Sequence, residues 1–279
     1  MAQGTLYLVS TPIGNLSDMT YRAVEILKAV EIIYAEDTRQ TKKLLNHYEI
    51  MTRLDSYHQH NEMGKSDHVI NLVQSGKSVA LVSDAGTPRL SDPGDTLIQK
   101  AYEKGVPICP IPGASALLSA LVSSPFSMGE FTFIGFIPTQ KKAQKVLFNR
   151  LREMPGLLVF YEAPHRINAT LKALFEGLGS RAIYVGRELT KKFEEHTLMT
   201  LSESLEISTP KGEYVIIVEG DEAPLELGDD YIEHVELLLA DGLSEKDAIK
   251  QVANLRNLKK NTVYMAYQRH KKEDDHGSI

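Results

Sequence analysis

The chain contains 279 residues, of which 42% are hydrophobic and 24% are charged, and its formal net charge is −6. These values are typical of a folded globular protein long enough for two domains, and they argue against a protein that coats nucleic acid indiscriminately. One cysteine excludes a disulfide framework, and no apolar stretch approaches 18 residues, so we expect a cytoplasmic protein with no membrane partner.

The first 125 residues alternate between short apolar runs and segments of helical period. This alternation predicts an α/β fold built on a parallel sheet, because helices join the strands of such a sheet. The expected strands are Leu6–Val9, Ile32–Ala35, Leu54–His58, Val79–Val82 and Val106–Ile111. The expected helices are Asp18–Val30 with Asp18 as its N-cap, a helix opened by Glu36-Asp37-Thr38-Arg39, Lys65–Gln74, Asp95–Lys104 and Ala114–Val122.

After Pro125 the pattern becomes more antiparallel in character. The expected helices here are Lys141–Arg152 and Pro164–Leu178. The expected strands are Phe131–Phe136, Leu157–Tyr161, Ala182–Arg187, His196–Leu201 and Glu213–Glu219, the last two forming a closing pair.

The segment from Asp221 to Pro224 is expected to be a linker, and three helical segments follow it. They are Asp230–Ala240, which Asp241-Gly242 would end, Glu245–Leu255, which Ser244 and Asp247 would open as a capping box, and Lys259–His270. We therefore expect an N-terminal α/β domain at residues 1–117, a second α/β domain at 118–222 and a small helical module at 223–279.

Three loops rich in glycine and proline directly follow predicted strands. They are Ser10-Thr11-Pro12-Ile13-Gly14-Asn15, Ser83-Asp84-Ala85-Gly86-Thr87-Pro88 and Pro112-Gly113-Ala114-Ser115-Ala116. Loops at the carboxyl ends of parallel strands gather along one edge, where ligands bind. There Asp84 would accept hydrogen bonds from a ribose hydroxyl or an ammonium group. No Gly-x-Gly-x-x-Gly and no P-loop is present, so we expect a ligand with an amino acid end, a ribose and an adenine.

Six short motifs in a fixed order give the chain a specific resemblance. They are STPIGNL (10–16), AEDTR (35–39), YHQHNE (57–62), VSDAGTP (82–88), FYEAPHR (160–166) and GRELTK (186–191). From about residue 4 to 220 the chain resembles the tetrapyrrole methylase superfamily of class III methyltransferases that use S-adenosylmethionine (SAM). Within it, the chain resembles the bacterial enzymes that 2′-O-methylate a decoding-region cytidine of 16S rRNA, and 223–279 resembles their helix-turn-helix module.

The resemblance implies SAM as methyl donor in a cleft between the two α/β domains, a homodimer, and 16S rRNA or the 30S ribosomal subunit as partner. By position, the residues toward the methionine and ribose would be Pro12, Asp84, Ala85, Thr87, Ser115 and Ala116. Those toward the adenine would be Tyr161, Glu162 and Gly212. Where the family usually has a glycine near the adenine this chain has Met199, whose side chain would narrow the slot or shift the loop.

Methyl transfer from an activated donor depends mainly on the position of the acceptor oxygen, and a base or a cation near a ribose 2′-hydroxyl would help. The candidates are Glu36, Asp37, Arg39, His58, Arg187 and Lys191, with His60 and His165 beside them. Two alternatives stay open: a capped helix start around Asp37, and a surface ion-pair cluster at 187–191. No metal is expected, because His58 and His60 have no cysteine or third histidine nearby.

Basic residues gather in two parts of this acidic chain. Between Lys246 and Lys272 eight lysines or arginines accompany one acid, and the stretch from Lys141 to Arg152 contains no acid. Such patches fit docking on RNA at chosen points, or they solvate helix faces. The RNA-contacting candidates are Lys141, Lys142, Lys145, Arg150, Arg166, Arg256, Lys259, Lys260, Lys271 and Lys272.

Two other functions compete with methylation of rRNA. One is methylation of a small tetrapyrrole or precorrin on the same fold, against which the two basic segments argue. The other is a non-catalytic RNA-binding or assembly protein with a vestigial cleft, against which the three intact ligand loops argue.

Overall fold

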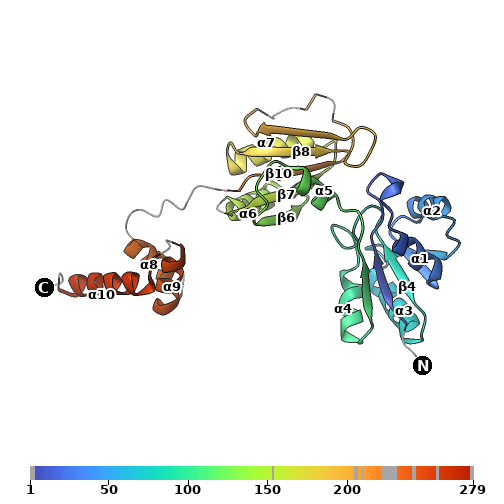
Figure 1. Cartoon of the computed structure of the whole chain (residues 1–279), viewed down its shortest axis with the longest axis horizontal. Coiled ribbons are helices and arrows are strands. Elements are labelled where there is room, and N and C mark those ends of the chain that lie inside the picture. Colours follow the sequence, from blue (N-terminus) through green and yellow to red (C-terminus); the bar gives the residue numbers. More distant parts are fainter. Residues whose placement is uncertain are drawn as a thin grey trace. The chain divides into compact units, whose positions relative to one another are not determined.

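The computed structural model describes residues 4–152, 154–203, 207–208, 210–220, 231–240, 243–255 and 258–276 (Figure 1). The chain forms two compact units, Met1–Asp221 and Glu222–Ile279. The expected linker and the domain boundary expected at 222/223 lie outside the described residues.

The first unit begins with a fully parallel sheet of strand order β3-β2-β4-β1-β5. Its strands are β1 (Leu6–Val9), β2 (Ile32–Ala35), β3 (Arg53–Ser56), β4 (Val79–Val82) and β5 (Ile108–Ile111). Helices α1 (Tyr21–Ala29), α2 (Thr38–His47), α3 (Glu62–Gln74) and α4 (Asp95–Glu103) connect them. Both faces of the sheet are covered, since alternate residues of β4 belong to two different hydrophobic cores.

Helix α1 begins later than the sequence predicts. Its N-cap is Thr20, whose hydroxyl accepts a hydrogen bond from the Ala23 N–H at 3.2 Å. Asp18 ends a separate short 3₁₀ turn, η1 (Leu16–Asp18), and Met19 after it is extended. The prediction of Asp18 as N-cap is therefore wrong, because extended backbone separates it from the helix.

The second sheet has the order β6-β7-β10-β8-β9, with β6 parallel to β7 and the other pairs antiparallel. Its strands are β6 (Phe131–Gly135), β7 (Leu157–Glu162), β8 (Ala182–Arg187), β9 (Glu195–Thr200) and β10 (Tyr214–Val218). The predicted pairing of the last two strands is wrong. Strand β10 is buried along its whole length and lies between β7 and β8, whereas the mostly exposed β9 forms an edge.

Each face of the second sheet packs against different elements. Helices α6 (Lys141–Leu151) and α7 (Ile167–Leu178) cover one face through a core that includes Phe160 and Ile216. The other face, with Val159 and Val215, packs against α5 (Ala116–Ser123) and against Ile13 from the first loop. The boundary predicted at 117/118 thus falls inside α5, a helix that follows the first sheet in the chain and packs on the second.

The second unit is a bundle of α8 (Tyr231–Ala240), α9 (Glu245–Leu255) and α10 (Lys260–His276) around its own apolar core. Ser244 caps α9, since its hydroxyl accepts the Asp247 N–H at 3.3 Å. The expected helix end at Asp241-Gly242 lies outside the described residues. Among the residues that can be described, no helix has the length and apolar character to cross a membrane.

Candidate functional site

The three ligand loops meet at the carboxyl edge of the first sheet. Thr11 and Gly86 pair through two backbone hydrogen bonds of 2.9 and 3.0 Å, which join the loops after β1 and β4. The third loop packs on the first so closely that a Cβ on Gly113 would lie 3.0 Å from the Cβ of Ser10. Close backbone contact of this kind requires the small residues that the sequence places there.

A cavity of about 320 Å³ opens between these loops and the second sheet. This volume lies within the range of small-molecule sites. It is lined by Ile13, Asp84, Ala85, Gly86, Thr87, Leu90, Ser91, Asp92, Ser115, Ala116, Phe136, Tyr161, Glu162, Ala163, Glu188, Leu189, Lys191, Glu213, Tyr214 and Val215. The wall therefore combines apolar side chains with several carboxylates and one lysine.

Most of the predicted cofactor residues lie in this wall, and three do not. Pro12 precedes Ile13, which lines the cavity, and Gly212 precedes Glu213, which also does. Met199 belongs to β9 and packs against the core on the α6–α7 face of the second sheet. An edge-strand position facing that core explains why the structure does not bring Met199 to the cavity.

The loops of the first sheet contribute two carboxylates to the wall, Asp84 and Asp92, and Glu36 interacts with both of them although it does not itself line the cavity. Burial raises the pKa of Asp92 above its ordinary value; a hydrogen bond from Ser83 opposes this rise, and the charge of Asp84 adds to it. The pKa of Glu36 is also raised, first by partial burial and then by the charges of Asp92 and Asp84. The interaction with His58 opposes this rise without cancelling it. The closely spaced carboxylates create a negative potential that favours a ligand carrying positive charge.

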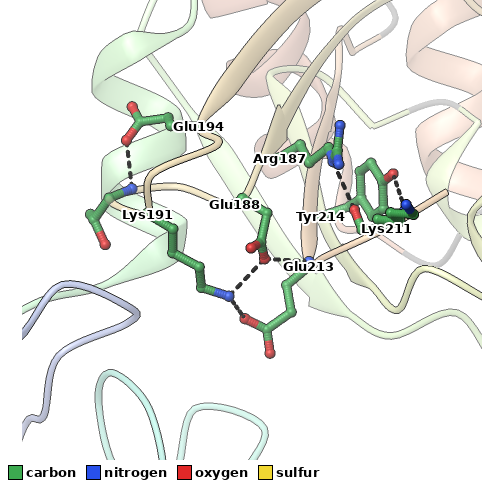
Figure 2. A network of polar contacts seen from close by, with 8 residues as sticks. Arg187, Glu188, Lys191, Glu194, Lys211, Glu213 and Tyr214 are labelled. Carbon is green, nitrogen blue, oxygen red and sulfur yellow. Dashed lines mark hydrogen bonds and ion pairs between the residues drawn. The ribbon is translucent and has the colours of Figure 1, made fainter. Parts of the chain in front are cut away.

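The opposite wall contains an ion-pair network between the end of β8 and the start of β10 (Figure 2). The Lys191 Nζ lies 2.7 Å from Glu188 Oε1 and 2.8 Å from Glu213 Oε2. Although burial alone lowers the pKa of Lys191, its hydrogen bonds to the two carboxylates raise it above the ordinary value. Lys191 is therefore a charged ammonium at the cavity wall.

Tyr161 and Glu162 are held by contacts of their own. The Tyr161 hydroxyl accepts the Leu117 N–H at 3.0 Å, which ties the start of α5 to the second sheet. Glu162 is buried, and its carboxylate accepts hydrogen bonds from the Ala163 N–H at 2.8 Å and the Thr170 hydroxyl at 2.5 Å. It thus anchors the start of α7 while lining the cavity.

Of the six predicted catalytic residues, only Lys191 lines the cavity, and most of the others have structural partners of their own. Asp37 caps α2, and its own N–H donates to Asp84 Oδ1 at 2.9 Å, while Arg39 pairs with Asp37 at 2.8 Å. The Arg187 guanidinium donates to the Lys211 carbonyl and to Glu195, both at 2.7 Å. His58 follows β3, and its buried Nδ1 has no partner among the residues that the structure describes.

The predicted RNA-contacting residues differ in their exposure and in the partners of their side chains. Lys141, Lys142, Lys145 and Arg150 are exposed on α6, beside a groove of about 240 Å³ between α6 and α7. Arg166 instead points inward, donating to the Ile137 carbonyl and pairing with Glu162 at 3.4 Å. Lys259 and Lys260 are exposed, Lys271 pairs with Glu245 at 3.0 Å, and Arg256 and the Lys272 side chain lie outside the described part.

Sequence reasoning missed two carboxylates of the cavity, Asp92 and Glu213. Glu188, inside the motif GRELTK, is predicted only as a member of the ion-pair cluster at 187–191, and in the structure it does pair with Lys191. Asp92 had a weaker signal, an acid before Pro93-Gly94 in the loop that leads to α4. Glu213 had none, because only the pairing of β10 with β8 brings it to this wall.

Gly14 lies against the side chain of Lys191, so a substitution there tests whether the position of this lysine matters. A Cβ at Gly14 would lie 2.3 Å from Lys191 Cγ, so Gly14→Ala must displace the lysine stem. We expect the methyl transfer that the sequence resemblance implies to fall about 100-fold, the effect of a group misplaced by about 1 Å. The φ of Gly14 is 152°, which L residues rarely adopt, so the thermal denaturation midpoint should fall as well, and activity is compared with that of the wild type at a temperature well below both midpoints. Unaltered activity would mean that the position of Lys191 is unimportant.

Comparison with known proteins identifies the relatives of this chain. A family model described as "Tetrapyrrole (Corrin/Porphyrin) Methylases" matches residues 5–205. Ribosomal RNA small subunit methyltransferase I of Halalkalibacterium halodurans is 44% identical over 274 residues, covering 95% of each chain. The protein of the same name from Bacillus subtilis is 46% identical over 275 residues, covering 95% of this chain and 94% of the relative. A crystal structure of diphthine synthase matches with a TM-score of 0.60 at 15% identity, covering 77% of this chain and 89% of that one, and supports the fold alone.

Proposed function

The chain belongs to the tetrapyrrole (corrin/porphyrin) methylase family, and we propose that it transfers a methyl group from SAM to the 2′-hydroxyl of a cytidine ribose in 16S rRNA. The observation that carries this proposal is the identity of 44–46%, over almost the whole length of both chains, to proteins named ribosomal RNA small subunit methyltransferase I. Membership of the methylase family supports SAM as the methyl donor, and the names of the relatives support ribosomal RNA as the substrate.

The donor groups of the cavity fit SAM. SAM carries a sulfonium and an ammonium, and its electrophilic methyl group is the chemistry that it supplies when bound. Asp84 and Asp92 provide negative charge on one wall, and Ala85, Thr87, Ser115 and Ala116 are small enough to leave room beside them. On the other wall Tyr161 and Tyr214 offer aromatic surface suited to an adenine.

The residues around the cavity suggest how the acceptor hydroxyl is handled. Glu36 follows β2, and its raised pKa makes its carboxylate a stronger base than an ordinary glutamate. We assign to Glu36 the role of general base, which accepts the proton of the 2′-hydroxyl. The Lys191 ammonium would stabilise negative charge that develops on the acceptor oxygen or on a neighbouring phosphate.

The decisive experiment is a methylation assay on three substrates. The purified protein is incubated with isotope-labelled SAM and either 30S subunits lacking their methylated cytidine, naked 16S rRNA, or uroporphyrinogen. The proposal requires label in 16S rRNA as 2′-O-methylcytidine, from the subunit or from naked rRNA. Label in uroporphyrinogen alone would overturn the choice of substrate, and no label in any of them would favour an RNA-binding protein without catalysis.

The exposed lysines of the second unit should supply salt-sensitive affinity for RNA. We expect replacement of Lys259, Lys260 and Lys271 by Gln to reduce the log–log slope of RNA affinity against salt by about 2, at about 0.7 per phosphate contact. Filter binding at several salt concentrations measures the slope. Lys28→Gln, on the exposed surface of α1, is the matched control. An unchanged slope in the triple variant would remove this unit from RNA docking.

We also infer that the protein acts as a homodimer in the cytoplasm. Helix α5 leaves Leu118 and Val122 exposed at 53% and 71%, and apolar surface of this kind suits a second copy of the chain. Light scattering of the purified protein tests this: a mass of one chain at micromolar concentration would contradict it.

A further inference from the structure

The turn that carries Lys191 into the cavity has an unusual backbone. Glu188 and Thr190 have φ values of 50° and 68°, although neither is glycine. Two more hydrogen bonds close the turn, from the Lys191 N–H to the Glu188 carbonyl at 2.9 Å and from the Glu194 N–H to the Lys191 carbonyl at 3.2 Å. Left-handed backbone at such residues is unfavourable and persists only where surrounding contacts fix it.

Glu194 provides the side-chain contact that fixes Thr190. Its Oε2 accepts the Thr190 N–H at 2.5 Å, one residue before Lys191. The Thr190 hydroxyl does not contribute, because it is buried and has no hydrogen-bond partner within the described part of the chain. The direction in which the chain enters Lys191 therefore depends on the Glu194 carboxylate.

The Glu194 carboxylate is itself oriented by a chain of hydrogen bonds. Its Oε1 lies 2.7 Å from His196 Nε2, and His196 Nδ1 lies 2.5 Å from the Tyr184 hydroxyl. Tyr184 is buried in β8, and its hydroxyl also contacts Ser123 Oγ at the end of α5, at 2.6 Å. These hydrogen bonds tie Glu194 to a buried residue of the second sheet, although Glu194 itself lies at the surface.

We propose that Glu194, oriented by His196, is a positioning residue for methyl transfer: it holds the turn that places the Lys191 ammonium at the cavity wall. This inference rests on the proposed function, in which Lys191 acts next to the acceptor. Glu194 does not line the cavity, and the proposal requires its effect to pass through Lys191. This dependence separates the proposal from a general contribution to stability.

A double-mutant cycle on the full-length protein tests the dependence. Glu194→Ala is expected to lower kcat by about 10- to 100-fold with little change in the Kd of SAM, and Glu194→Gln should recover most of the loss because its amide oxygen still accepts the Thr190 N–H. When Lys191 is already Met, Glu194→Ala should have no further effect. Fully additive losses would overturn the proposal.

Glu203→Ala is the matched control for loss of a surface carboxylate. Glu203 Oε2 accepts the Thr200 hydroxyl at 2.8 Å at the end of β9, so its removal deletes a similar contact away from Lys191. We expect its activity to equal that of the wild type. A loss in this control as large as in Glu194→Ala would mean that any weakened turn in this region suffices.

A chemical readout tests the same inference without any RNA substrate. The Lys191 amine is held between two carboxylates, so an amine-acylating reagent should label it slowly, whereas the neighbouring Lys192 is exposed. In Glu194→Ala, mass spectrometry should show several-fold faster labelling of Lys191 and unchanged labelling of Lys192. Unchanged labelling of Lys191 would overturn the positioning role. Faster labelling in a protein that methylates no RNA would instead refute only the proposed function.

Discussion

Asp84→Asn is expected to weaken SAM binding by about 10- to 100-fold. Asparagine keeps an oxygen that can accept the Asp37 N–H, now received by Asp84 Oδ1 at 2.9 Å, so the two loops stay joined. What the variant loses is a negative charge at the cavity wall, and a hydrogen bond to a charged group contributes about 1.5–3 kcal/mol. Isothermal titration calorimetry with SAM measures the loss.

The matched control for Asp84→Asn is Asp95→Asn. Asp95 begins α4 and pairs with Arg89 at 2.8 Å, but it does not line the cavity. We expect it to bind SAM as the wild type does. If Asp84→Asn also binds SAM with unchanged affinity, the carboxylate wall is not the part of the cavity that faces the cationic groups of SAM.

The strands of the first sheet and the meeting of its loops follow from local features of the sequence. Short apolar runs such as Val79–Val82 are buried on both faces, so their pattern alone indicates a parallel sheet. The meeting of Thr11 with Gly86 follows in turn, because β1 and β4 are parallel neighbours. Residues placed by strand ends, such as Asp84 and Ser115, could therefore be predicted.

What the sequence does not reveal depends on strand order in the second sheet. Nothing local distinguishes pairing of β10 with β9 from its insertion between β7 and β8, since both are antiparallel arrangements. That insertion brings Glu213 next to Glu188 and Lys191. A prediction from β9 and β10 as a pair therefore misses half of the ion-pair network.

Met199 and Arg166 illustrate the same limit. Successive side chains on β9 point to opposite faces of the sheet. Only the strand register decides that Met199 packs toward the core. Arg166 is basic and ends the motif FYEAPHR, but its guanidinium donates to the Ile137 carbonyl and pairs with Glu162. Residue type alone does not distinguish a phosphate ligand from an internal partner.

The role of general base that we propose for Glu36 rests on its position after β2 and on its raised pKa. Burial first, and the charges of Asp92 and Asp84 next, raise its pKa, so its carboxylate holds a proton more tightly than an ordinary glutamate. A base must be unprotonated to act, and activity should therefore be lost as the pH falls through this raised pKa and be complete above it.

Glu36→Gln is accordingly expected to lower kcat by about 10²- to 10⁴-fold, the usual contribution of a general base, while the Kd of SAM stays nearly unchanged. The pH profile of kcat decides the role, because the acid limb of the wild type should disappear or shift in Glu36→Gln. Asp37→Asn is the informative neighbour: its amide oxygen still accepts the Arg39 N–H and caps α2, so the variant loses only the exposed ion pair with Arg39, and both the stability and the acid limb should remain close to those of the wild type. A Glu36→Gln enzyme that keeps both the rate and the acid limb of the wild type would exclude Glu36 as the base and leave methyl transfer to positioning alone.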